Sequence, residues 1–198
     1  LPQIIPQTPA DATGSQTLEH ILEPSSGLAL WLTSHRQPAW RGKAIDRWLF
    51  ARRSQTFADM TDLPLELRSQ LEASYRIWTT SIVKHNSSED GTEKLLLQLH
   101  DGERIECVLL REQERRTVCI SSQVGCAMGC VFCASGIDGV VRNLTTGEIL
   151  EQLLRLAHLL PATERISHIV VMGMGEPLAN LDRLLPALAT AQNPDGLG

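Results

Sequence analysis

Long hydrophobic runs are absent from this chain of 198 residues. Its longest apolar stretches, at 95–99 (LLLQL) and 168–174 (HIVVMGM), fall far short of the roughly 20 residues that a membrane span requires. The first residues, LPQIIPQTPADATGSQT, also lack a basic region followed by an apolar core, so no secretory signal is expected. We therefore expect a cytoplasmic protein without a membrane partner. In a reducing compartment, clustered cysteines are more often metal ligands or catalytic thiols than disulfides.

An excess of positive charge is also absent, since the formal net charge is −5, which argues against general coating of nucleic acid. The segment 34–53 is the exception, with six basic residues against one acid and with Trp40, Trp48 and Phe50 between them. Basic side chains neutralise phosphates and aromatic rings stack on bases, so this segment could face RNA. A solvated helix face whose Trp48 and Leu49 pack inward is the alternative, and the segment alone favours it. The basic residues are Arg36, Arg41, Lys43, Arg47, Arg52 and Arg53.

The composition changes twice along the chain. Residues 1–27 are rich in Pro, Gln, Thr and Ser without periodicity, which predicts a flexible tail. Residues 28–78 show helical periodicity, with one helix opening after Pro64, and we expect a small helical domain there. Residues 79–198 begin with strand patterns and form the remaining part of the chain.

The strand-rich part predicts a β-hairpin followed by βα units. Asp101-Gly102 favours a two-residue type I′ turn, which would place Leu97 opposite Glu106. Thr145 and Glu148 have the spacing of a capping box at the start of a helix. A strand, loop and helix occur twice in succession, which predicts an α/β fold with parallel strands. Two parallel strands cannot close a barrel, so we expect this sequence to be part of a longer chain.

Four of the five cysteines lie within CISSQVGCAMGCVFCASG, residues 119–136. Cys126, Cys130 and Cys133 form a C-x3-C-x2-C pattern in a loop rich in small residues, between a predicted strand and a predicted helix. Three thiolates at this spacing can hold a [4Fe–4S] cluster and leave one iron open for a substrate or cofactor. A four-cysteine zinc site that includes Cys119 is the alternative. The seven-residue step from Cys119 to Cys126 departs from paired C-x2-C zinc ligands, so the iron–sulfur interpretation is favoured.

Several motifs in the same order resemble the RlmN/Cfr family of radical S-adenosylmethionine (SAM) RNA methyltransferases. They are CISSQVGCAMGCVFCASG, RNLTTGEILEQ and VMGMGEPLANLD, together with PAWRGKAIDRWLF and FADMTDLPLELRSQL in the helical part. The similarity covers roughly residues 36–190. It implies a radical SAM (βα) barrel that is incomplete in this sequence, preceded by a small helix-hairpin-helix-like domain and a β-hairpin extension.

The resemblance also implies cofactors and their ligands. Cys126, Cys130 and Cys133 match the cysteines that bind the [4Fe–4S] cluster, and Gly175 and Glu176 in GMGEP match the pair that contacts SAM. In this family, SAM bound to the open iron is cleaved to a 5′-deoxyadenosyl radical. The GMGEP motif alone would be an ordinary turn before a proline, and its place after the cysteines gives it weight.

Two further roles follow from the resemblance. Glu106 matches the family's general base, whereas the residues alone allow equally an exposed edge-strand glutamate paired with Arg104. On the predicted register, Glu106 would share a partly desolvated sheet face with leucines. Cys119 matches a cysteine that forms a transient disulfide with a C-terminal methyl-carrying cysteine, which this sequence does not contain. The loop after the cluster departs from the family pattern at Asp138 and Val140, so substrate choice could differ.

The resemblance therefore implies a methyltransferase acting on an adenine carbon, C2, of 23S rRNA, with tRNA as a further substrate. Its implied partners are RNA and an electron donor such as flavodoxin or ferredoxin, and the expected state is a monomer. Two alternatives remain: another radical SAM enzyme on the same scaffold, and a non-catalytic metal-binding module that binds RNA.

Overall fold

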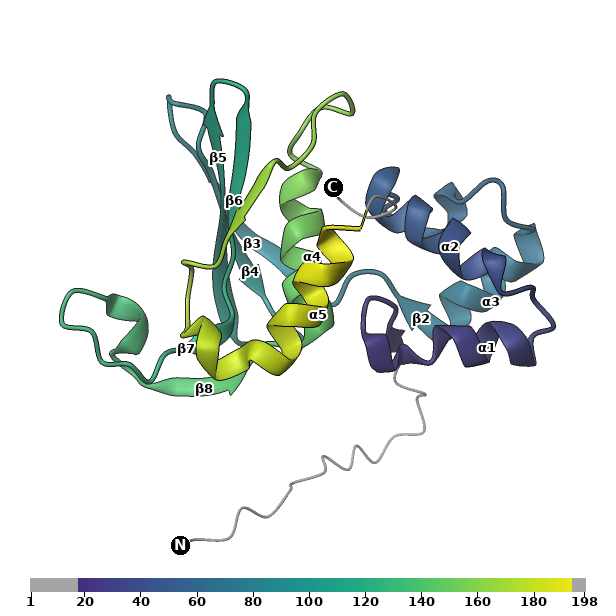
Figure 1. Cartoon of the computed structure of the whole chain (residues 1–198), viewed down its shortest axis with the longest axis horizontal. Helices are drawn as coiled ribbons and strands as arrows, with labels where there is room; N and C mark the ends of the chain where they lie inside the picture. The colour runs from purple at the N-terminus through teal and green to yellow at the C-terminus, as the bar shows by residue number, and fades with distance from the viewer. Residues whose placement is uncertain (1–17, 194–198) are drawn as a thin grey trace, which may run out of the picture.

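The computed structural model describes residues 18–193, and a five-stranded sheet lies at one end of it (Figure 1). The strands run in the order β3-β4-β5-β6-β9, antiparallel from β3 to β6 and parallel between β6 and β9. A separate antiparallel pair, β7 and β8, follows the sheet. Among the described residues, no helix is long and apolar enough to cross a membrane. The strands are β3 (Ser81–Ser87), β4 (Glu93–Gln98), β5 (Arg104–Glu112), β6 (Arg115–Cys119), β7 (Gln123–Gly125), β8 (Val140–Asn143) and β9 (His168–Val170).

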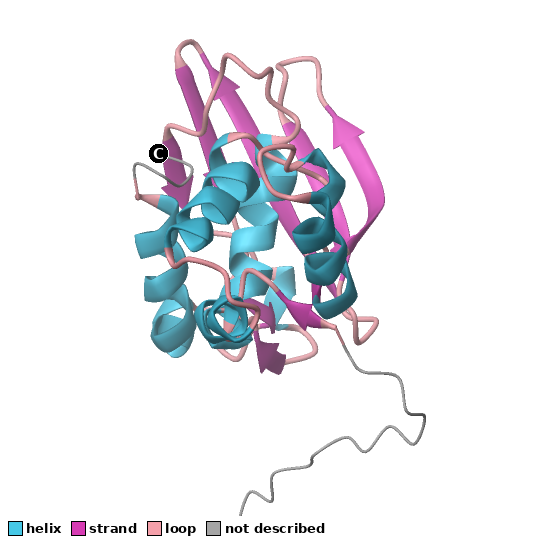
Figure 2. Cartoon of the chain, turned by 90° about the vertical axis from the view of Figure 1, so that its right-hand side faces the viewer, coloured by secondary structure: helices cyan, strands magenta, loops and turns pink. Residues whose placement is uncertain are grey.

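A group of short helices lies on the far side of α4 from the sheet (Figures 1 and 2). The helix predicted after Pro64 is confirmed as α3. The predicted tail was too long at its C-terminal end, because β1 pairs with β2 and both Ile21 and Leu22 are buried; residues 1–17 lie outside the described part. The elements are β1 (Glu19–His20), η1 (Pro24–Ser26), α1 (Leu28–Ser34), α2 (Trp40–Asp46), η2 (Arg47–Ala51), η3 (Phe57–Asp59), α3 (Leu65–Ser74) and β2 (Tyr75–Arg76).

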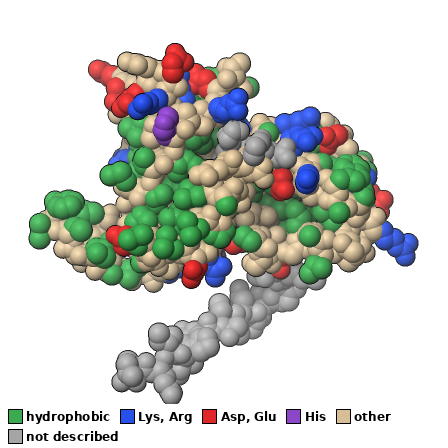
Figure 3. Space-filling view, in the orientation of Figure 1, with side chains coloured by type: hydrophobic (Ala, Val, Ile, Leu, Met, Phe, Trp, Pro, Cys, Tyr) green, Lys and Arg blue, Asp and Glu red, His purple; other side chains and the backbone are tan. Residues whose placement is uncertain are grey.

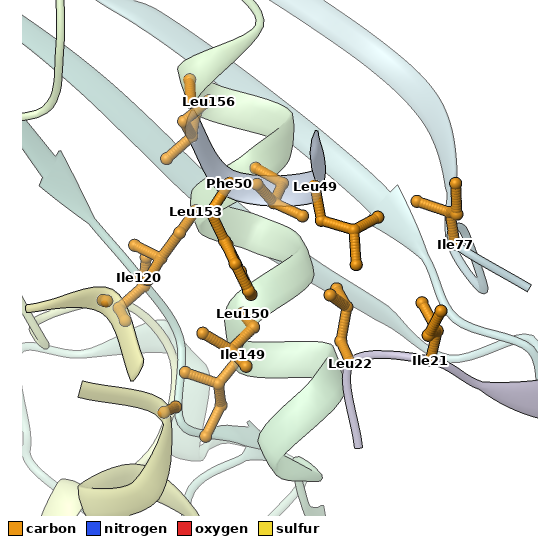
Figure 4. Packing of buried hydrophobic residues seen from close by; sticks show 14 of the residues in the cluster. Ile21, Leu22, Leu49, Phe50, Ile77, Ile120, Ile149, Leu150, Leu153 and Leu156 are labelled. Atoms are coloured by element: carbon orange, nitrogen blue, oxygen red, sulfur yellow. The ribbon is translucent and has the colours of Figure 1, made fainter. Parts of the chain in front are cut away.

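Helix α4 (Thr146–Ala157) is the centre of the hydrophobic core. Every residue of α4 except Arg155 is buried, because the sheet covers one side of the helix and the helical domain covers another. Figure 4 shows Leu150 and Leu153 close to Leu49 and Phe50 of η2. The predicted capping box is confirmed: the Thr145 hydroxyl accepts from the Glu148 main chain, and the Glu148 carboxylate accepts from Thr145 N. Helix α5 (Leu181–Ala191) packs beside α4.

Two polar contacts fasten the helical domain to α4. The buried Glu151 carboxylate accepts hydrogen bonds from the main-chain N–H and the hydroxyl of both Thr79 and Thr80, in the segment that joins the two parts of the chain. The Arg53 guanidinium donates to main-chain carbonyls at the C-terminal end of α4, including that of Ala157 at 2.8 Å. The charged donor adds to the one hydrogen bond that Ala157 O already accepts, from Leu160 N at 3.2 Å, and it lies at the negative end of the helix.

The β4–β5 hairpin differs from the prediction by one residue. Leu99 N donates to Glu103 O at 2.8 Å and Gly102 N donates to Leu99 O at 3.0 Å, so the loop has three residues, and Gly102 has φ +90°. A type I turn that ends in a glycine with positive φ is the usual form of a three-residue hairpin loop. Glu106 therefore pairs with Leu96, and the predicted pairing with Leu97 is wrong.

Candidate active site

The change of register places Glu106 on the sheet face that α4 does not cover. On β5, Ile105, Cys107 and Leu109 are buried, while Glu106 and Val108 between them are half-buried. Directly paired residues share a face, and Val108 pairs with Cys119 of β6. We call this surface the open face; it includes Lys94, Leu96, Glu106, Val108 and Cys119. The two residues proposed to act on substrate, Glu106 and Cys119, thus lie on one surface.

Glu106 shares its face with Leu96 and Val108, and not with Leu97 as the predicted register implied. Its side chain is 45% exposed, and its carboxylate Oε1 lies 3.0 Å from Lys94 Nζ on the neighbouring strand. Strand β5 is internal to the sheet, so the alternative of an edge-strand glutamate paired with Arg104 is also wrong. The carboxylate is accessible from solvent and faces a cation.

Cys119 is a half-buried free thiol at the end of β6, and all five cysteines of the chain are free. Burial raises the pKa of Cys119 above the ordinary thiol value. Cys107, for which the sequence predicted no role, is buried on the opposite face, and burial raises its pKa to about 12. Of these two thiols, only Cys119 is available to a substrate at the open face.

The loop with the other three cysteines projects from the β7–β8 pair, at the lower left of Figure 1. Its base is closed by a 2.9 Å hydrogen bond from Cys126 N to Gly139 O, and a further one of 3.0 Å joins Cys133 N to Cys130 O. Cys130 and Cys133 are exposed and line one shallow concavity. Four apolar side chains of the loop are also exposed, and they form the hydrophobic lobe in Figure 3: Met128, Val131, Phe132 and Ile137.

The donor chemistry of this loop fits an iron–sulfur cluster. It offers three thiols and no competing carboxylate on the concavity, and hydrogen bonds from Ser135 and Gly136 lower the pKa of Cys133 toward the thiolate that binds iron. Within residues 18–193, no three Cys, His, Asp or Glu side chains lie close enough together to hold a metal ion. The three thiols of the loop therefore do not converge on one point. The set of ligands therefore fits by chemistry and by sharing one loop.

The GMGEP loop follows β9 and packs against residues 120–123, which run from the end of β6 into the start of β7. Gly175 has φ +99°, and an added Cβ would lie 2.7 Å from Gln123 N, so a larger residue does not fit there. The Gln123 side chain accepts from Glu176 N at 2.8 Å, and Gln123 N donates to Met174 O at 3.2 Å. The cysteine-bearing segment and the GMGEP loop therefore meet at the carboxyl ends of two adjacent parallel strands, where α/β proteins usually bind ligands.

Glu176 has a local structural role in this loop. Its carboxylate accepts a 3.0 Å hydrogen bond from Leu178 N and so caps the short helix η5 (Pro177–Asn180). The side chain is half-buried, which leaves part of the carboxylate accessible. Gly175 and Glu176 lie on one turn next to the segment that leads to the cysteines, and their contact with SAM stays a prediction.

Arg142 ties the base of the cysteine loop to the rest of the fold. Its guanidinium forms a bidentate pair with the buried Glu148 carboxylate, with both N–O distances at 2.8 Å, and a further 2.6 Å contact with Asp101 of the hairpin loop. The contact with Glu148, followed by that with Asp101, raises the pKa of Arg142. Strand β8, the hairpin and the N-terminus of α4 are therefore joined by one charged group.

The basic segment 34–53 divides into buried and exposed members. Phe50 is buried, the Trp48 indole donates to Asp62, and Arg53 binds the end of α4, so these three residues serve the fold. Trp40 is 62% exposed. Four of the basic residues of the segment are also exposed: Arg36, Lys43, Arg47 and Arg52.

Sequence reasoning missed two residues of this site. Lys94 contacts Glu106, and its alternation with Leu95 along β4 would have indicated its face once the register was known. Gln123 holds the GMGEP loop through both its side chain and its main chain, and no local pattern in the sequence distinguishes it.

Comparison with known proteins relates the chain to one group. A family described as "Ribosomal RNA large subunit methyltransferase N-terminal domain" matches residues 24–77. The "Probable dual-specificity RNA methyltransferase RlmN" of Rhodopirellula baltica is 55% identical over 196 residues, which are 98% of this chain and 53% of that protein. The "Dual-specificity RNA methyltransferase RlmN" of Geobacter sulfurreducens is 46% identical over 170 residues, 86% of this chain and 46% of that protein.

A solved structure gives the same relationship. The crystal structure of a radical SAM methyltransferase from Sphaerobacter thermophilus superposes with a TM-score of 0.83 at 34% identity, over 90% of this chain and 53% of that one. The chain spans about half the length of the curated relatives it matches. The predicted family is thereby confirmed: the chain belongs to the RlmN family and corresponds to the N-terminal part of its members.

Proposed function

We propose that this chain is part of a radical SAM RNA methyltransferase that methylates an adenine carbon, C2, in 23S rRNA and in tRNA. One observation carries the proposal: the segment that leads through β7 to the cysteine loop meets the GMGEP loop at the carboxyl ends of the adjacent parallel strands β6 and β9. Glu106 and Cys119 lie on the open face beside them. Ligand binding and acid–base chemistry are therefore brought to one region of the molecule.

In this proposal β6, α4, β9 and α5 are the first two βα units of a radical SAM barrel. The relatives are about twice as long as this chain, which leaves room for the remaining units. The helix-hairpin-helix-like domain, with exposed Trp40 and the exposed basic residues of the same segment, contributes to RNA binding. The enzyme acts in the cytoplasm as a monomer, with an electron donor such as flavodoxin or ferredoxin.

Cys126, Cys130 and Cys133 would hold the [4Fe–4S] cluster, and the Gly175–Glu176 turn would contact SAM. When bound, the cluster and SAM together supply the 5′-deoxyadenosyl radical chemistry. Gly175 lets the main chain approach a ligand closely because it has no side chain at the turn. The exposed apolar side chains of the loop would help to exclude water once the site is covered.

Glu106 would accept the proton that leaves the adenine carbon, since its carboxylate is accessible on the open face. Cys119, as a thiolate, would attack the sulfur of the methyl-carrying cysteine of the longer chain, so that the S–S bond forms as the bond from that sulfur to the carbon on adenine breaks and the product is released. Its half-buried position at the end of β6, on the open face, leaves the thiol partly accessible to a second thiol.

The test uses the full-length protein, reconstituted anaerobically with iron and sulfide. The expected result is about four iron atoms per chain, cubane absorption, and SAM-dependent appearance of methyladenosine in 23S rRNA taken from a deletion strain. One zinc per chain without cubane absorption would reject the radical SAM assignment. Unchanged methylation of both rRNA and tRNA would reject the RNA methyltransferase assignment.

Glu106→Gln tests the proposed base, and Glu112→Gln is its matched control, because Glu112 is an exposed glutamate at the end of the same strand. Glu106→Gln should keep its iron content and lose methyl transfer by about 100-fold or more. Glu112→Gln should retain both. Full turnover by Glu106→Gln would remove Glu106 as the base.

A further inference from the structure

Ser121 lies just beyond the end of β6 and links the two halves of the candidate site. Its side chain is fully buried. The hydroxyl donates to the main-chain carbonyl of Glu106 at 2.7 Å and accepts from the main-chain N–H of Met174 at 2.9 Å. One side chain thus joins the residue proposed as the base to the middle of the GMGEP loop.

Helix α4 fixes the position of this hydroxyl. The Gln152 side chain, also fully buried, accepts from Ser121 N at 2.8 Å and donates to Ser121 O at 3.1 Å. With its main chain held on both sides, Ser121 cannot move to follow a displaced loop. A buried, fully paired network of this kind favours one arrangement, because every alternative leaves a polar group unsatisfied.

The next residue shows that burial alone does not require such pairing. Ser122 is 1% exposed, and within the described part of the chain its hydroxyl has no hydrogen-bond partner. Only its main chain takes part in the contact with the GMGEP loop, through Ser122 N and Met174 O at 2.8 Å. Two adjacent buried serines therefore differ in the role of the hydroxyl, which bridges the site in Ser121 and has no hydrogen-bond partner in Ser122.

We propose that Ser121 is a positioning residue that sets the distance between Glu106 and the SAM-contacting turn, so that bound SAM and the base that removes the proton are held at the spacing that the reaction requires. The inference rests on the proposed function for its catalytic consequence. The bridge itself is a property of the fold: loss of the hydroxyl leaves the Glu106 carbonyl and the Met174 N–H without partners, and the GMGEP loop is freed on that side.

The first measurement does not depend on activity. Hydrogen–deuterium exchange of the peptide containing Met174 is followed in the full-length protein for wild type, Ser121→Ala and the matched control Ser122→Ala. Ser121→Ala should raise the exchange rate about tenfold, and Ser122→Ala should leave it unchanged. Equal exchange in all three proteins would overturn the bridge.

The second measurement addresses the site. In the reconstituted enzyme, Ser121→Ala should weaken SAM binding about tenfold and slow methyl transfer at saturating SAM and RNA, with iron content and RNA affinity unchanged. Unaltered SAM binding despite faster exchange would overturn the positioning role. Wild-type protein without SAM binding would instead reject the proposed function and, with it, the catalytic consequence of the bridge.

A second variant that keeps a hydrogen-bonding group at position 121 covers the case in which Ser121→Ala does not fold. Ser121→Cys has a weak donor and acceptor in the same place, so its exchange rate and SAM affinity should lie between those of wild type and the tenfold change. Values equal to those of wild type would overturn the proposal.

Discussion

Replacing Gly175 by alanine tests the close approach of the GMGEP loop to the cysteine-bearing segment. An alanine Cβ at this position would lie 2.6 Å from Gln123 Cβ and 2.7 Å from Gln123 N. Rotation of the Gln123 side chain relieves neither contact, because Cβ is fixed by the main chain and Gln123 N also donates to Met174 O. The loop or the segment must therefore shift.

Gly102 provides the matched control, because it has a similar backbone conformation without the contact. Its φ is +90° against +99° for Gly175, and an added Cβ would meet nothing within 4 Å. In both alanine variants, the positive φ lowers the free energy of unfolding by about 1–2 kcal/mol. The smaller conformational freedom of the unfolded chain offsets roughly 0.4–1 kcal/mol of this loss. Gly102→Ala should therefore cost about 1 kcal/mol.

The contact adds a second cost at Gly175 only. Overpacking against a rigid neighbour typically costs about 1–3 kcal/mol, so Gly175→Ala should lose roughly 2–4 kcal/mol in total. Urea unfolding followed by far-UV circular dichroism gives the free energy of unfolding of both variants and of wild type. Equal losses for Gly175→Ala and Gly102→Ala would refute the reasoning, because the close approach would then carry no energy.

Three further predictions concern the packing around α4 and the thiols. Arg53→Met should lower the free energy of unfolding by about 2–3 kcal/mol in the same urea assay, because the carbonyls at the end of α4 lose a charged donor. The control Arg52→Met should cost under about 1 kcal/mol, because the ion pair of Arg52 with Asp62 is exposed and 3.9 Å long. Similar losses would remove the helix-end role of Arg53. Glu151→Gln should lower the free energy of unfolding by about 1–3 kcal/mol, because an amide nitrogen would face the N–H and O–H donors of Thr79 and Thr80. An unchanged midpoint of thermal unfolding would argue against a role of the Glu151 carboxylate in joining the two parts of the chain. Burial raises the pKa of Cys107 to about 12, so its thiol stays protonated and unreactive at pH 8. Iodoacetamide at pH 8 should therefore label exposed Cys130 and should label Cys107 only after urea is added, as measured by peptide mass mapping. Labelling of Cys107 before urea is added would contradict its burial.

Local signals in the sequence were sufficient for much of the fold. The capping box at Thr145 and Glu148 marked the start of α4, and Pro64 preceded the start of α3, because both signals depend on groups within one helical turn. The C-x3-C-x2-C spacing likewise placed three thiols on one loop without any knowledge of distant contacts. Relationships over a few residues are encoded directly in the chain.

The register of the hairpin was beyond such signals. Two-residue and three-residue loops share the Asp101-Gly102 pair, and the choice between them moves every side chain of the strand to the other face. The sequence thus identified Glu106 through resemblance but gave it the wrong surroundings. Its contact with Lys94 and its place beside Cys119 became visible only when the strands were paired.

The sequence by itself determined where α3 and α4 begin, where the cysteines gather and which family the motifs resemble. The tertiary structure alone decided which side chains meet across 30 or more residues, as Ser121 meets Gln152 and Arg53 meets the end of α4. The physical reason is that a buried hydrogen bond needs both partners in fixed positions, and packing of α4 between the sheet and the helical domain supplies those positions.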